Sequence, residues 1–187
     1  MVNVDKLIDV LILFAKSDQE MSPLRINKLL YFIDKCHLRK YGRFVLGDRY
    51  YRLPLGQVPS YTYDLINDFF EPFRIRGKSE NPLTEFFSRE KKGKYNVLKL
   101  KKERSPDYLS ESERNVIKIV LDEYGKTRTP RLVDIAHSEK TNTHTPQPNE
   151  IEISLFLDGL PSSKKDFIFS LLEIDRENAS ICKFLNK

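Results

Sequence analysis

The stretch INKLLYFIDKCHLRKYGR, residues 26–43, decides the fold because it has the side-chain spacing of a long interior helix. Its apolar side chains recur at intervals of three and four residues, so they share one broad helix face. That face holds Ile26, Leu29, Leu30, Ile33, Cys36 and His37. Ser22 and Pro23 form an N-cap and a first helical residue, and Gly42 suits a left-handed helix end. The sequence therefore predicts a helix from Ser22 to Gly42.

The outer side of this helix is predicted to carry its basic residues. These residues are Lys28, Lys35, Arg39 and Lys40. Upstream, the residues from Val4 to Phe14 place apolar side chains around nearly the whole circumference of another helix. A helix of that kind lies inside a fold, so we expect the two helices to pack as an antiparallel pair.

The middle of the chain mixes short extended segments with one helix. Asp48 to Leu53 and the Pro/Gly-rich residues after it predict a short extended segment and a loop. A helix then begins at Pro59 or Ser60 and stops before Pro72. Between Leu83 and Leu100 the apolar period changes to about two, which predicts a β-hairpin around the polar turn 89–94.

The last part of the chain is predicted to be helical again. Ser110 and Glu113 have capping-box spacing at the start of a helix that ends at Gly125. Thr129 starts a shorter helix that ends near Ser138, and residues 141–149 form a loop. Residues 151–157 fit a strand or a short helix, and a final helix, continuous or interrupted near residue 178, follows position 161. The predicted fold class is predominantly α with a small β-hairpin (α+β), a compact multi-helix domain.

Length and composition are typical of one soluble globular domain covering residues 1–187. The formal charge is +5, with basic clusters at 89–94 and 99–104. Such clusters fit either phosphate neutralisation or a solvated hairpin edge. The apolar stretch 7–15 is too short to cross a membrane, no signal-peptide pattern is visible, and only two cysteines occur. We therefore expect a cytoplasmic protein that does not associate with membranes.

Residues that could perform chemistry are sparse and scattered. Three histidines and two cysteines show none of the tight spacings of a zinc site. Cys36 and His37 are adjacent on a helix and point about 100° apart, so they cannot act as nucleophile and base. His37 is expected to be a hydrogen-bonded core residue, and the loop at Gly56 is no phosphate-binding motif. The sequence predicts no catalytic residues, no metal ligands, no cofactor and no enzyme activity.

Aromatic and basic residues gather beside the loop at Gly56 and form a candidate partner-binding surface, because Tyr and Arg are enriched at interface hot spots. The candidate residues are Tyr50, Tyr51, Arg52, Gly56, Gln57 and Tyr63. The two-residue period of an extended segment predicts that one of Tyr50 and Tyr51 points into the core.

The chain resembles the Panacea domain family, also called SocA-like or phage-associated GepA-like. The resemblance is carried by Lys28, Leu29, Leu30, Tyr31, Phe32, His37, Leu38, Tyr41, Gly42 and Arg43, and then by Tyr51, Gly56, Val58, Pro59 and Tyr63. It covers about the first two-fifths of the chain well. Two positions depart from the family pattern: Gln57 stands where proline is usual, and Leu55 where an aromatic residue is frequent.

The resemblance implies an antitoxin of a bacterial or phage toxin–antitoxin system, which neutralises a cognate toxin protein by direct binding. Some relatives instead deliver a toxin to a Clp-type protease, so an adaptor role stays open. The alternative is a nucleic-acid-binding regulator in which the first two helices form a helix-turn-helix and the 83–100 hairpin a basic wing. The long helix lacks a cluster of base-reading side chains, which makes nucleic acid the weaker choice of partner.

Overall fold

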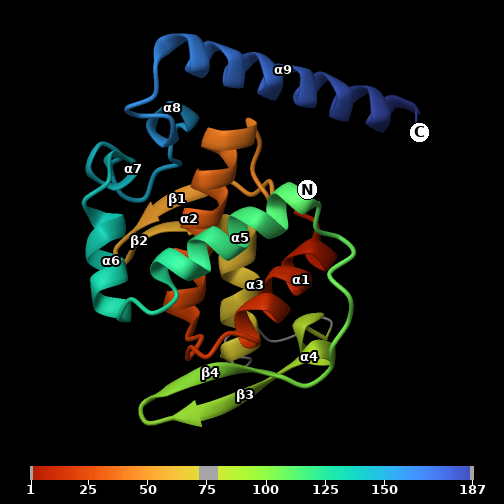
Figure 1. Cartoon of the computed structure of the whole chain (residues 1–187), viewed down its shortest axis with the longest axis vertical. Coiled ribbons are helices and arrows are strands. Elements are labelled where there is room, and N and C mark those ends of the chain that lie inside the picture. The colour runs from red at the N-terminus through yellow and green to blue at the C-terminus, as the bar shows by residue number, and fades with distance from the viewer. Residues whose placement is uncertain (1, 72–79, 186–187) are drawn as a thin grey trace.

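The computed structural model describes residues 2–71 and 80–185, with side chains up to residue 178, as helices and two small antiparallel sheets (Figure 1). The helices are α1 (Val4–Ala15), α2 (Pro23–Tyr41), α3 (Ser60–Phe70), α4 (Leu83–Phe86), α5 (Glu111–Tyr124), α6 (Thr129–His137), α7 (Lys140–Thr143), α8 (Ile153–Phe156) and α9 (Ser162–Leu185). The strands are β1 (Tyr50–Leu53), β2 (Gly56–Pro59), β3 (Phe87–Lys92) and β4 (Tyr95–Leu100). The predicted α+β class is confirmed.

Helix α2 runs through the centre of the molecule, and its predicted ends are confirmed. The Arg25 N–H donates to the Ser22 side chain at the N-terminus, and Gly42 has φ +76° at the C-terminus. A Cβ on Gly42 would lie 2.6 Å from Leu171 Cδ1, so α9 packs closely against this end of α2. The helix that lies most closely along α2 is α5 rather than α1, contrary to the predicted antiparallel pair.

The two sheets are hairpins placed at different sites. In the first, β1 pairs with β2, with Tyr51 opposite Val58, where the sequence predicted an extended segment and a loop. In the second, β3 pairs with β4, from Phe87 opposite Leu100 to Lys92 opposite Tyr95. The predicted 83–100 hairpin is thus confirmed for its strands, but its first four residues form the single turn α4.

Two further segments differ from their prediction in detail. Residues 140–143 form the single turn α7 inside the predicted loop 141–149, and residues 153–156 adopt the helical alternative as α8. The final helix α9 continues past Asn178 without interruption. The capping box of α5 is present as predicted, with Ser110 and Glu113 exchanging bonds.

Helix α3 is capped by a residue from outside the helix. Its N-cap position is Pro59, which has no side-chain hydrogen bond to offer. Asp48 fills this role from the preceding loop, where its carboxylate accepts the N–H groups of Tyr61 and Thr62 at 3.3 and 2.8 Å. Within the part of the chain that the structure describes, every helix is too short or too polar to cross a bilayer.

Candidate functional site

Six polar side chains meet where α2, β2, α6 and the start of α7 come together. We call these residues the polar centre: Lys28, Tyr31, Gln57, His137, Glu139 and Thr141. The Lys28 Nζ donates to the backbone oxygen of Gln57 at 3.0 Å. The Gln57 side-chain amide donates to the Ala136 backbone oxygen at 2.7 Å and to Thr141 Oγ1 at 2.8 Å. The polar centre therefore fastens the first hairpin to three helical elements.

Tyr31 and Glu139 extend this network toward the surface. The Tyr31 hydroxyl donates to Glu139 Oε2 at 2.6 Å and shares a hydrogen bond with Thr141 Oγ1 at 2.7 Å. Lys35 forms an ion pair with the same Glu139 carboxylate. Burial, reinforced by the neighbouring Glu139 charge, raises the pKa of Tyr31 well above its ordinary value. Tyr31 is therefore protonated and acts as a hydrogen-bond donor.

Lys28 is fully buried, which overturns the prediction that it lies on the outer side of the long helix. Among the described residues its amine donates one hydrogen bond, to a neutral carbonyl, and pairs with no carboxylate. Burial lowers the pKa of Lys28 to about 7. Near neutral pH the amine is thus partly uncharged, although its burial keeps it out of contact with molecules in solution.

Gly56 is required by this crowded arrangement. Its φ of +90° favours glycine, and a Cβ there would lie 2.7 Å from both Lys28 Nζ and His137 Nε2. His137 Nε2 and Gln57 Oε1 are buried without a hydrogen-bond partner among the described residues. Position 57 departs from the usual family proline, and here its amide makes two bonds that a proline could not make.

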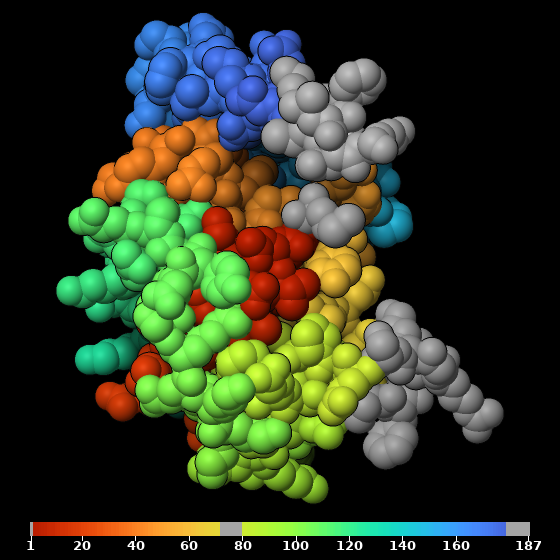
Figure 2. Space-filling model, turned by 90° about the vertical axis from the view of Figure 1, so that its right-hand side faces the viewer, coloured from red at the N-terminus to blue at the C-terminus, as the bar shows by residue number. Residues whose placement is uncertain are grey.

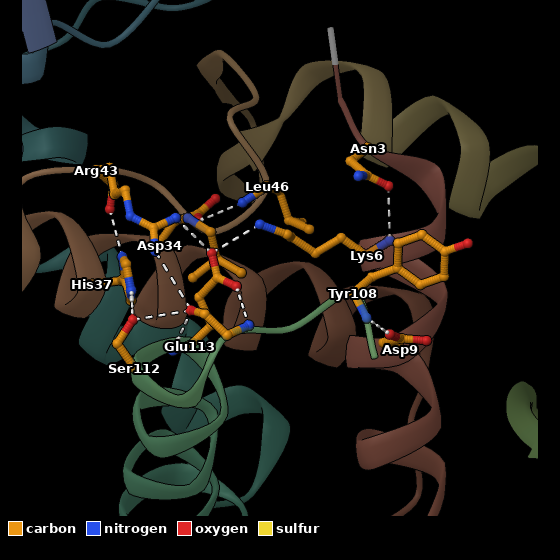
Figure 3. Close-up of polar contacts among 12 residues, drawn as sticks. Asn3, Lys6, Asp9, Asp34, His37, Arg43, Leu46, Tyr108, Ser112 and Glu113 are labelled. Carbon is orange, nitrogen blue, oxygen red and sulfur yellow. Dashed lines mark hydrogen bonds and ion pairs between the residues drawn. The ribbon is translucent and has the colours of Figure 1, made fainter. Parts of the chain in front are cut away.

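A second polar cluster joins the end of α2 to α1 and α5 (Figure 3). Glu113 accepts hydrogen bonds from Lys6 and from Arg43, both at 2.8 Å. Its own burial would raise its pKa, but Lys6 and the hydrogen bonds from Ser110 outweigh burial and hold the pKa below its ordinary value. His37 is buried as predicted, with Nδ1 at 2.7 Å from the Arg43 backbone oxygen and Nε2 at 3.2 Å from Ser112 Oγ. Burial lowers the pKa of His37.

A buried carboxylate holds the loop after α2. Asp34 Oδ1 accepts the N–H groups of Val45 and Leu46 at 2.6 and 3.2 Å, and its other oxygen accepts the Tyr50 hydroxyl at 2.8 Å. Burial raises the pKa of Asp34 to about 6 despite these bonds. Several family-motif residues of α2, among them Leu29, Leu30 and Tyr31, are fully buried. Their side chains shape the interior around α2.

The six predicted partner-binding residues separate into buried and accessible sets. Tyr50, Gly56 and Gln57 are buried, and Tyr50 is the inward-pointing member of the Tyr50–Tyr51 pair. Tyr51, Arg52 and Tyr63 are partly exposed.

The accessible side chains near β1 contact the segment before α8. The Tyr51 hydroxyl donates to Glu150 Oε2 at 3.2 Å, and Arg52 donates to the Thr145 backbone oxygen at 2.5 Å. That this surface binds a partner stays a prediction, and it now rests on Tyr51 and Arg52. Sequence reasoning missed Glu150 and Thr145 because nearly a hundred residues separate them from β1.

The structure also shows where the residues that could bind a metal ion or act as a nucleophile or base lie. Residues 2–71 and 80–178 hold no group of three or more His, Cys, Asp or Glu side chains that could bind a metal ion. Cys36 is a free thiol, and burial raises its pKa. His137 lies beside Gly56 and Lys28 in the polar centre.

In the nucleic-acid alternative α2 would be the helix that reads bases, and part of it is buried. Arg25, Asn27 and Lys28 of α2 are all buried, so these side chains are not placed to contact bases. The β3–β4 hairpin does carry charge, since residues 87–102 contain seven Lys or Arg and one Glu, a net +6 against +5 for the whole chain. Several of these charges are paired, with Lys92 and Lys99 on Glu90.

Comparison with models of protein families gives a match that covers the central part of the chain. The model of a family described as "Antitoxin SocA-like, Panacea domain" matches residues 26–142. The matched span begins in α2 and ends in α7, so it contains the whole polar centre and the Arg43–Glu113 contact. Comparison with curated proteins and with solved structures gave no significant match.

Proposed function

This chain belongs to the SocA-like antitoxin family of Panacea domains, and from that membership we propose that it neutralises a cognate toxin by binding it directly. The family match over residues 26–142 is the observation that carries the proposal. In this mechanism the antitoxin covers the toxin's active surface in a stoichiometric complex within the cytoplasm. The rigid interior around α2 presents a preformed surface, which lowers the entropy cost of binding.

The accessible side chains near β1 are the proposed contact surface. Tyr51 and Arg52 combine a large aromatic area with a charged group, the combination that dominates interface hot spots. Both are held in place by bonds to the segment before α8, so little side-chain freedom is lost when a partner binds.

The function is tested by co-expressing this chain with the protein encoded beside its gene. We expect growth to be rescued only when the antitoxin reaches about equal amounts, and a one-to-one complex to elute in size-exclusion chromatography. Rescue by trace amounts would instead favour delivery of the toxin to a Clp-type protease. Absence of both rescue and complex formation would overturn the proposed function.

The contact surface is tested by Tyr51→Ala and Arg52→Ala. Each change should weaken toxin binding roughly tenfold in isothermal titration, because each removes a side chain of the hot-spot type. Tyr95→Ala is the matched control, since Tyr95 is 69% exposed on the distant β3–β4 hairpin. Unchanged affinity in both surface variants would contradict this choice of surface and leave the antitoxin function standing.

A further inference from the structure

A groove runs between the segment before and within α8 and one side of α9. Its volume is about 440 Å³, enough for a few side chains of another molecule. Ile153, Phe169 and Leu172 supply its apolar lining. Both walls lie at the end of the molecule opposite the β3–β4 hairpin (Figures 1 and 2). The groove also lies beyond residue 142, where the family match ends.

Helix α9 leaves apolar side chains uncovered beside this groove. Phe169 lines the groove and is still 38% exposed. Moving an exposed phenylalanine side chain out of water is favourable, so a partner that covers it gains affinity. An exposed apolar lining with a polar rim is the usual composition of a surface that binds another protein.

The rim of the groove is acidic on an otherwise basic protein. Glu150, Glu152 and Glu173 line it together with Arg176, and Arg49 pairs with Glu150 at 3.8 Å. Glu152 and Glu173 are exposed, and among the described side chains neither carboxylate forms an ion pair. The chain as a whole carries +5, so the groove is a local reversal of charge. Charge complementarity therefore selects a basic segment as the occupant.

The groove continues the contact surface proposed above. Tyr51 forms an antiparallel bridge with Glu150 and donates its hydroxyl to that carboxylate at 3.2 Å. The Arg52 N–H donates to the Asn149 backbone oxygen at 3.0 Å. One partner can thus cover Tyr51, Arg52 and the groove without a gap.

We propose that this groove binds a basic amphipathic segment of the toxin, with aliphatic side chains on Phe169 and Leu172 and Lys or Arg side chains on Glu152 and Glu173. The inference rests on the proposed antitoxin function and assigns the partner's chemistry at a second part of the same surface. Groove binding requires both kinds of contact, so its loss must follow either an apolar or a charge substitution in the groove.

The groove is tested by comparing substitutions of α9 residues that line it with substitutions of α9 residues that do not. Phe169→Ala and Glu173→Lys should each weaken binding of the toxin encoded beside this gene at least tenfold. Phe167→Ala and Glu177→Lys are the matched controls, because these exposed residues lie on α9 outside the groove and should change affinity less than twofold. All four variants replace surface side chains, and circular dichroism melting verifies that each is folded.

The outcomes separate the two proposals. If the wild type binds the toxin and the groove variants bind equally well, the groove proposal is overturned while the antitoxin function stands. If the wild type neither binds nor protects, the function itself fails. A photocrosslinker at position 169 should capture a toxin peptide rich in Lys and Arg. Capture of an acidic peptide, or of a second copy of this chain, would overturn the assignment.

Discussion

Lys28 is a residue whose burial could not be predicted from the sequence. The helical pattern placed it on the solvent side, yet its amine lies in the interior against one carbonyl oxygen. The reason is tertiary: residues 56 and 137 cover it, and neither lies near Lys28 in the sequence. A buried lysine of this kind is a penalty to folding when charged, since desolvation disfavours the ammonium form.

The penalty at Lys28 predicts a specific pH dependence. The pKa is about 7 in the folded chain and about 10.4 in an unfolded one, so the unfolded chain binds more protons between these values. Stability therefore rises with pH across that window and is lowest, from this group, below pH 7. Lys28→Met should raise the free energy of unfolding near pH 7, and its advantage should shrink toward pH 9. Urea denaturation measures both, with Lys126→Met as the exposed control.

Substitution of two glycines with positive φ distinguishes the cost of backbone strain from the cost of side-chain crowding. Gly47 has φ +68° with nothing within 4 Å of an added Cβ, whereas Gly56 has φ +90° with Lys28 and His137 at 2.7 Å. Gly47→Ala should cost about 1–2 kcal/mol from backbone strain alone. Gly56→Ala should cost at least about 2 kcal/mol more, because the polar centre must also shift. Equal losses in thermal or urea unfolding would show that the polar centre yields easily.

At the scale of elements, the helices whose ends carry capping residues or a terminal glycine could be predicted from the sequence. Ser22, Pro23 and Gly42 mark the ends of α2, and the Ser110–Glu113 spacing marks the start of α5. The single turns α4 and α7 were not predicted because four residues are too few to show a period. The cap of α3 was missed for a different reason, since its donor groups and Asp48 are over ten residues apart.

The remote cap of α3 can be tested directly. Asp48→Ala leaves the N–H groups of Tyr61 and Thr62 without their acceptor, and should destabilise the protein by about 1–2 kcal/mol. Amide hydrogen exchange at these two residues should also become faster. Asp64→Ala removes an exposed carboxylate of the same helix and should change stability by less than about 0.5 kcal/mol. Equal effects of the two substitutions would show that Asp48 does not act as the cap.

At the scale of the whole molecule, sequence reasoning reached the fold class and the family but only part of the site. The apolar periods and the motif of α2 sufficed for the first two. The polar centre, by contrast, gathers residues from α2 to α7, and the groove pairs the segment at 150–154 with α9. Contacts of such long sequence separation leave no periodic signal, so only the folded chain brings them together.

Residues 87–102, the β3–β4 hairpin and the two residues after it, hold a net +6, and the glutamate-rimmed groove lies at the far end of the longest axis (Figure 1). This separation contributes a component to the electric dipole moment along that axis. A toxin with a cationic face is therefore rotated into alignment during its diffusional approach, while the hairpin repels a wrongly turned encounter. Association should thus be faster at low ionic strength, before any contact residue is engaged.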